Sequence, residues 1–204
     1  MARGFKRKGQ RFVAAFDEME RGVVAGLMEQ TRELVAPPER ERTGDAFEDL
    51  VAGLGVSVAA DDQVAGPNEV GGARDPALER LLPTAHKGDD EVASEFRRLT
   101  ENDLRDRKAT TLTTAIDALR AADGDRLELT RDQAHAMVIA LTDTRLVLGE
   151  RLGLRTDEDA LELDERVSSL DADDPAVYAA SFYDFLTWMQ ESLTTALMGR
   201  GLFR

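Results

Sequence analysis

The sequence predicts a mainly α-helical single domain (1–204) of about six helices, with a small antiparallel sheet. Two observations support this fold class. Helix-capping signals followed by apolar residues at helical spacing recur along the chain, whereas the alternation typical of strands is confined to two short stretches. A chain of 204 residues is long enough to bury an apolar core without disulfides, so the absence of cysteine does not argue against stable folding.

The N-terminal segment (1–16) is expected to form a β-hairpin. If residues 8–9 form its turn, Phe5 lies opposite Phe12 and the alternating apolar residues share one face. An isolated hairpin is only marginally stable in water, so this one needs a further strand or a helix behind it. The alternating segment 126–130 is the candidate third strand.

Helices are predicted for 17–54. The first begins at the capping box of Asp17 and Glu20 and ends before a pair of prolines, and a shorter helix starts near Asp45. Periodicity is lost over 55–74, where glycines and small residues dominate. This segment is therefore predicted to be a mobile loop.

The segment 75–153 is predicted to hold further helices. Asp75 precedes a proline, a pattern typical of an N-cap followed by a first-turn proline. Thr130 and Gln133 form a second capping box that starts a helix of about 22 residues. The apolar spacing over 90–122 fits either one continuous helix or two.

The C-terminal part combines an acidic segment with an aromatic helix. Between Asp157 and Asp174 nine acids stand against one arginine, a net charge of 1 − 9 = −8, and we predict a solvated loop over 156–174. The segment 175–199 carries aromatic residues at helical spacing and is predicted to be a core helix, because aromatic side chains bury the largest areas.

The overall composition is acidic, with 26 basic and 40 acidic residues and a net charge of −14. This charge argues against broad nucleic-acid binding, which depends on clustered Lys and Arg. No apolar run reaches the length of a membrane span and the N-terminus lacks the pattern of an export signal, so a cytoplasmic protein is expected. One local exception to the acidity is a basic N-terminal patch: Arg3, Lys6, Arg7, Lys8 and Arg11.

Few residues are available for site chemistry. The chain has no cysteine, and its two histidines, His86 and His135, lack a plausible third metal ligand. The glycine spacings do not match a phosphate loop or a dinucleotide fingerprint. We therefore expect no catalytic residue, no metal site and no cofactor.

Arg145 stands out because it falls within an apolar stripe of the helix that follows Thr130. A guanidinium in that position needs a partner, since a buried unpaired charge costs several kcal/mol. The favoured interpretation is an internal ion pair, with Glu191 as the candidate partner. The alternative is a socket for a carboxylate of another protein.

Arg97 and Arg98 form a second candidate feature, next to an apolar residue in the segment around Phe96. An exposed helix face with local Glu–Arg pairs explains them most simply. The functional alternative is a patch that binds an anion or docks a protein.

Five segments together resemble an actinobacterial family long catalogued as a domain of unknown function. Its members are often encoded beside the ClpS adaptor, and its best-described branch is the AosR-like oxidation-sensing regulators. The resemblance covers nearly the whole chain. The segments are RDP at 74–76, RLLP at 80–83, EFRRLTENDLR at 95–105, RLVLGERLG at 145–153 and WMQESL at 188–193.

This resemblance implies a regulator that acts through protein contact, with an extracytoplasmic-function sigma factor or another transcription or proteolysis component as the partner. It also implies sensing through a cysteine pair near the N-terminus in the redox-sensing branch. The 204 residues contain no cysteine, so a disulfide switch cannot operate in them.

The favoured function is a non-enzymatic cytoplasmic regulator or adaptor that binds another protein. One alternative is an enzyme or small-molecule binder whose site is built from Arg97, Arg98, Arg145 and nearby carboxylates. The third is DNA binding through the basic N-terminal patch. The oligomeric state is not readable from the sequence.

Overall fold

The computed structural model describes residues 2–36, 69–70, 73–83, 90–171 and 174–199. The described part of the chain is mainly α-helical, as predicted, with one three-stranded and one two-stranded antiparallel sheet. The helices are α1 (Glu18–Val35), α3 (Pro76–Leu81), α4 (Asp90–Arg120), α5 (Arg131–Leu152), α6 (Asp157–Ser168) and α7 (Pro175–Met198). The strands are β1 (Arg3–Lys8), β2 (Arg11–Ala15), β3 (Glu69–Val70), β4 (Ala73–Arg74) and β5 (Arg126–Leu129).

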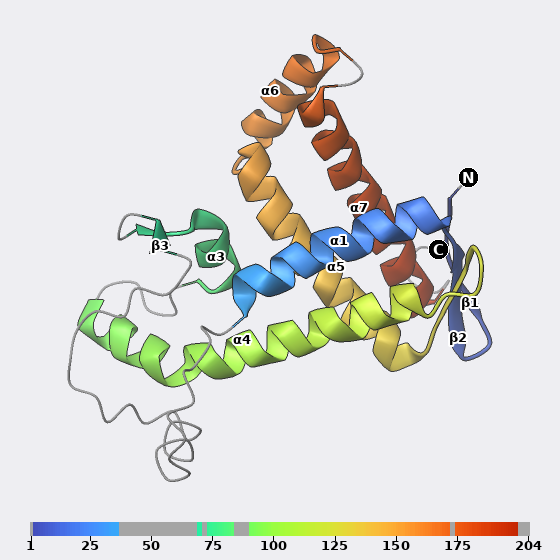
Figure 1. The fold of residues 1–204 in the computed structure, drawn as a ribbon, viewed down its shortest axis with the longest axis horizontal. Coiled ribbons are helices and arrows are strands. Elements are labelled where there is room, and N and C mark those ends of the chain that lie inside the picture. The colour runs from blue at the N-terminus through green and yellow to red at the C-terminus, as the bar shows by residue number, and fades with distance from the viewer. Residues whose placement is uncertain (1, 37–68, 71–72, 84–89, 172–173, 200–204) are drawn as a thin grey trace.

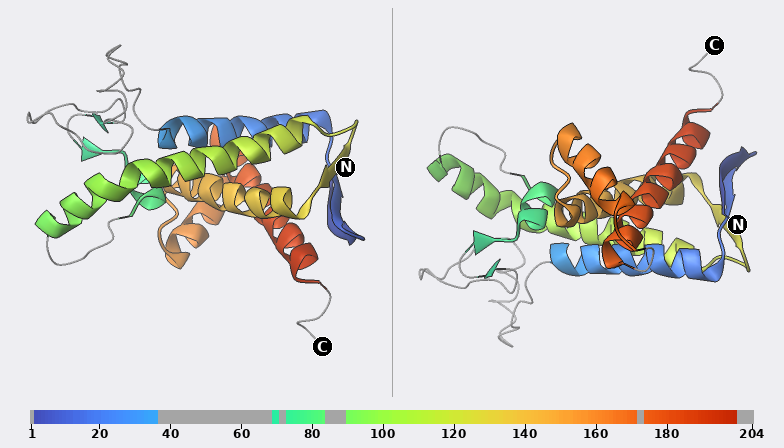
Figure 2. Two further views of the ribbon diagram at one scale, coloured as in Figure 1. Left: turned by 90° about the horizontal axis from the view of Figure 1, so that it is seen from below. Right: turned by 90° about the horizontal axis from the view of Figure 1, so that it is seen from above.

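The long helices pack around α5. Figure 1 shows α1 and α4 side by side and antiparallel, with α5 crossing behind them. On its other side α5 packs against α7, and the short helix α3 packs near its C-terminal end. Figure 2 shows the three-stranded sheet at one end of this helical assembly. α5 is thus the element that most of the other helices share.

The three-stranded sheet confirms the hairpin and its predicted third strand. Its order is β1-β2-β5, so β2 is the central strand. The predicted turn is wrong by one residue: Lys8 pairs with Arg11, and Arg7, not Phe5, lies opposite Phe12. The turn begins at Gly9, whose φ of 63° suits the left-handed conformation of tight hairpin turns. Phe5 is still buried, and it lies at an irregularity in the register between Arg3 and Lys6.

The buried face of the sheet joins the aromatic part of the core. Phe16, directly after β2, is only 2% exposed. Its ring makes edge-to-face contacts with Phe5, Phe185 and Trp188, at centroid distances of 5.7, 5.9 and 6.2 Å. The backbone N–H of Phe5 also donates to Ser192 Oγ on α7 (3.2 Å). These contacts attach the hairpin to α7.

The predicted helix starts are confirmed. Asp17 and Thr130 are N-caps with complete capping boxes, and Asp75 is the N-cap before the first-turn proline of α3. α5 has the predicted 22 residues and ends at Gly153, whose φ of 78° is left-handed. The alternative left open for 90–122 is resolved as one continuous helix, α4.

The prediction of an acidic loop over 156–174 is wrong for most of its length, because α6 occupies this segment. Thr156 forms a capping box with Asp159, and acidic residues in the first turn interact favourably with the helix dipole. Leu163 is buried and gives α6 one apolar contact face. The high charge density masked these local helix signals in the sequence.

Two further predictions need adjustment. The end of the segment predicted as a loop (55–74) forms the short strands β3 and β4, while the helix predicted near Asp45 lies outside the described residues. The C-terminal helix α7 contributes to the core from Phe185 onward: Leu186, Met189 and Leu193 are buried, whereas Tyr178 near its start is 53% exposed.

Replacing Phe16 by Ala should lower the free energy of unfolding by about 3–5 kcal/mol, because it removes three ring contacts and leaves a cavity. Urea denaturation followed by circular dichroism measures this change. Met19→Ala is the control: Met19 is 79% exposed and its replacement should change stability by about 0.5 kcal/mol or less. Equal effects of the two substitutions would contradict this description of the core.

Candidate functional site

Arg145 lies on the side of α5 that faces α7 and is only partly buried, and its predicted partner is wrong. Its Nη1 donates to Gln190 Oε1 (2.9 Å), and its guanidinium carbon lies 5.1 Å from the centre of the Tyr183 ring. Glu191 is exposed and makes no ion pair with Arg145. Neighbouring helix residues point about 100° apart, so Gln190 faces α5 and Glu191 does not.

The guanidinium of Arg145 has no carboxylate partner within the described part of the chain. Nη2 donates to the Tyr183 hydroxyl at a long 3.4 Å, and the buried Nε has no hydrogen-bond partner. Of the five N–H groups of the guanidinium, two are therefore used. Gln190 is itself held by a bond from its Nε2 to Thr142 Oγ1 (2.8 Å). The arrangement fixes the orientation of a positive charge without neutralising it.

An apolar groove lies next to this polar group on the same two helices. It has a volume of about 360 Å³. Ile139 is 49% exposed and Met198 is 64% exposed, so two large apolar side chains are accessible at this groove. The groove is lined by His135, Val138, Ile139, Thr194, Leu197 and Met198. We call the groove together with Thr142, Arg145, Tyr183 and Gln190 the α5–α7 seam.

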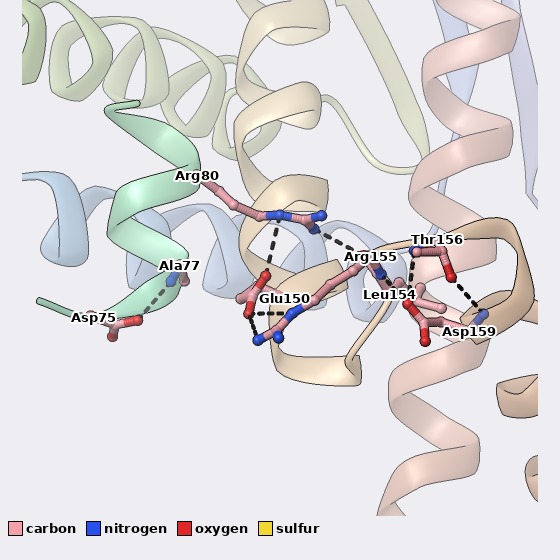
Figure 3. Close-up of polar contacts among 8 residues, drawn as sticks. All are labelled: Asp75, Ala77, Arg80, Glu150, Leu154, Arg155, Thr156 and Asp159. Atoms are coloured by element: carbon pink, nitrogen blue, oxygen red, sulfur yellow. Dashed lines mark hydrogen bonds and ion pairs between the residues drawn. The ribbon is translucent and has the colours of Figure 1, made fainter. Parts of the chain in front are cut away.

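Three other charged residues of α5, Asp143, Glu150 and Arg151, have partners of opposite charge. Near its C-terminus, Glu150 accepts from Arg80 of α3 (Nε to Oε2, 3.2 Å) and from Arg155 (Nε to Oε1, 3.1 Å), as Figure 3 shows. Arg80 also donates from Nη1 to the carbonyl of Leu154 (2.9 Å). The Glu150 carboxylate raises the pKa of Arg155 above its usual value by a hydrogen bond and by its charge. Glu150 thus fastens α3 and the start of α6 to α5.

A second link between α3 and α5 joins Arg151 Nη2 to Asp75 Oδ2 (2.5 Å).

A further ionic cluster holds β4, α4 and α1 together. Glu101 receives bonds from Arg74 and Arg105, and Arg105, only 8% exposed, also donates to the carbonyl of Ala36 at the end of α1 (3.1 Å). Charged residues of four of the five segments that carry the resemblance are therefore used to connect helices.

One buried ion pair, between Lys108 of α4 and Asp143 of α5, is not predicted from the sequence. Lys108 Nζ lies 2.6 Å from Asp143 Oδ1, and Asp143 is 4% exposed. Its second oxygen, Oδ2, has no partner in the described structure. The signal available in the sequence was the polar run of residues 142–145 in the middle of an otherwise apolar helix. Arg145 was singled out from this run, and its neighbours were not.

The remaining predicted residues do not join this site. Arg97 and Arg98 lie within α4, and their side chains are outside the described part of the structure, as is His86. His135 is exposed at the edge of the groove. Within the described residues no carboxylate lies beside Arg145, and the site that would combine Arg145 with Arg97 and Arg98 stays a prediction.

The basic N-terminal patch is exposed along the hairpin. All five cations are exposed. Among them, only Arg11 lies near an acid in the described structure, with its Nε 3.7 Å from Oε1 of Glu128 on β5. The patch lies on the sheet at one end of the molecule, away from α6 (Figure 1). The basic patch of the hairpin and the acidic residues of α6 thus lie on different elements.

A second groove lies between α1 and α5, with a volume of about 330 Å³. Its lining mixes apolar and polar side chains and includes Arg151, which is paired with Asp75. Within the described residues, no group of three or more His, Cys, Asp or Glu side chains could hold a metal ion. None of the described helices is long and apolar enough to cross a membrane.

A family profile described as "Domain of unknown function (DUF2017)" matches residues 2–197. The chain belongs to this family. Among curated proteins it is similar to the "Putative oxidative stress regulator AosR" of Mycobacterium leprae (strain TN), with 35% identity over 141 residues, which are 61% of this chain and 59% of that protein. It is 32% identical over 140 residues to the "Oxidative stress regulator AosR" of Mycobacterium tuberculosis (strain ATCC 25618 / H37Rv), with the same shares.

The alignment spans about three fifths of the length of these curated relatives. No solved structure matches the chain significantly. The family match confirms the resemblance stated from the five sequence segments.

The buried pair of Lys108 and Asp143 gives a stability prediction. Lys108→Met should lower the free energy of unfolding by about 3 kcal/mol, because it leaves the buried carboxylate without its counter-ion. The double substitution Lys108→Met with Asp143→Leu should recover most of this loss. Urea denaturation measures both, with Arg107→Met on the exposed side of α4 as the control. A double variant no more stable than the single one would contradict the pair.

The start of α6 gives a pH prediction. Asp159 accepts from the backbone N–H groups of Arg155 (2.9 Å) and Thr156 (2.7 Å), which lowers its pKa below the ordinary value of 3.8. Because the folded pKa is the lower one, its stabilising contribution is complete above pH 3.8 and is lost as pH falls through the folded pKa. An NMR titration of Asp159 should show a midpoint below 3.8, and the stability difference from Asp159→Ala should shrink over the same range. A midpoint at or above 3.8 would refute this cap.

Proposed function

We propose that this DUF2017 chain is a non-enzymatic cytoplasmic regulator that acts by binding another protein, in a transcriptional response to stress. Two relatives that share about a third of their aligned residues with it are named as oxidative stress regulators. These names support a regulatory role for this chain. The component that it binds is proposed to belong to the transcription or proteolysis machinery, as the family resemblance implies.

One structural observation carries the contact mechanism. Three charged groups of α5 form ion pairs with neighbouring helices: Asp143 pairs with α4, and Glu150 and Arg151 pair with α3. Such groups position helices and are not free to act on a substrate. The α5–α7 seam instead leaves large apolar side chains accessible, and accessible apolar surface is typical of protein contact.

The signal that this regulator receives is proposed to be something other than thiol oxidation. Disulfide formation needs cysteine, and the 204 residues contain none. Of the six methionines, Met28, Met137 and Met189 are buried and shielded from oxidants, whereas Met19 and Met198 are exposed. A change in the amount or state of the bound partner would suffice as an input.

Affinity purification of the tagged chain from its native cells, followed by mass spectrometry, tests this function. We expect one transcription or proteolysis component to be enriched over an untagged control, and to form a stoichiometric complex when both proteins are purified. Treating this chain alone with the thiol oxidant diamide should leave its affinity unchanged, because it offers no thiol. Failure of every enriched protein to bind the purified chain would refute the proposal.

A further inference from the structure

We propose that the α5–α7 seam is the docking site for an apolar segment of a partner protein that carries an Asp or Glu, and that Arg145 receives this carboxylate. The inference rests on the proposed function, because it names the surface through which the contact is made. It assigns the guanidinium and the neighbouring groove one common role.

The charge of Arg145 is not neutralised within the described structure. A guanidinium that is partly buried and lacks a counter-ion carries a desolvation cost that a carboxylate would offset. The intramolecular partners, Gln190 and Tyr183, are neutral acceptors and leave three of its five N–H groups unused. One unused N–H, on Nε, is buried, and the other two are on Nη1 and Nη2. Carboxylates bind guanidinium groups in a two-pronged geometry, so an acidic side chain matches the two unused donors on Nη1 and Nη2.

The side chain of Arg145 is held in one orientation by residues of α7. The cation stacks on the Tyr183 ring at 5.1 Å, and Gln190 is held in turn by Thr142. A side chain fixed by two neighbours loses less conformational freedom on binding than a free surface arginine. The exposed Arg107 of α4, by comparison, has no side-chain hydrogen bond or ion pair in the described structure. Arg145 is therefore arranged as a receptor and not as a solvated surface charge.

The apolar groove lies on the same two helices as Arg145 and its partners. Val138, which lines the groove, and Arg145 are seven residues apart on α5, so they lie on nearly the same face about 10 Å apart along the helix. Thr142 lies between them in the chain and accepts from Gln190 of α7, and Thr194, one turn after Gln190, lines the groove. The seam thus has an apolar end and a cationic end, and it matches a segment with an apolar anchor about 10 Å from a carboxylate.

Peptide display against the immobilised full chain provides the probe. Random 12-residue peptides are selected, and the enriched ones are measured by fluorescence anisotropy. We expect peptides with apolar residues and at least one Asp or Glu, whose Kd rises at least tenfold with Arg145→Met and with Ile139→Asp. Arg107→Met, a loss of one exposed arginine on α4, should leave the Kd unchanged. Unchanged melting temperatures would show that the variants remain folded.

A reciprocal exchange separates a direct contact from a structural effect. If the peptide acid is replaced by Lys, binding to the wild-type chain should be lost and binding to Arg145→Glu should be regained at least in part. Enriched peptides without acids, or a Kd unaffected by Arg145→Met, would overturn the proposal. So would a concentration-dependent dimer that Ile139→Asp dissociates, since the seam would then be occupied by a second copy.

This outcome is distinguishable from failure of the proposed function. A native partner that binds Arg145→Met and Ile139→Asp as tightly as the wild-type chain would refute the seam as the docking site while leaving the regulator function intact. A native partner that loses at least tenfold in affinity with both variants would support both proposals.

Discussion

The burial of α5 is the constraint on which the rest of the structure depends. This helix packs against α1, α3, α4 and α7, so its polar residues must be satisfied by groups on its neighbours. Asp143 takes Lys108 from α4, and Glu150 takes Arg80 from α3. Each pair fixes the rotation of α5 against a different helix, because a shift of register would leave a buried charge unpaired.

Arg145 is the exception within this arrangement. It points to α7, where Gln190 and Tyr183 orient it without supplying a negative charge. The same face of the helix pair leaves Ile139 and Met198 largely accessible. The buried carboxylates of α5 are paired, whereas Arg145 is an oriented cation beside accessible apolar side chains. This combination is consistent with a contact surface for another protein.

The agreement between prediction and structure follows the range of the interactions. Capping boxes act within four residues, so Asp17 and Thr130 were recognised as helix starts from the sequence. The same kind of signal at Thr156 was outweighed by the charge density of the following residues, and α6 was missed. The turn at Gly9 was misplaced by one residue, because hairpin register also depends on which residues the core buries.

The sequence by itself determined the fold class, most helix boundaries, the lack of a thiol switch and the membership of the family, since these depend on local spacing, on composition and on residue motifs. The tertiary structure alone decided the partners of the charged side chains. Gln190 and not Glu191 meets Arg145, and Lys108 meets Asp143 across 35 positions of sequence. Such pairings depend on how helices are rotated and placed against one another, and helical periodicity within one segment does not contain that information.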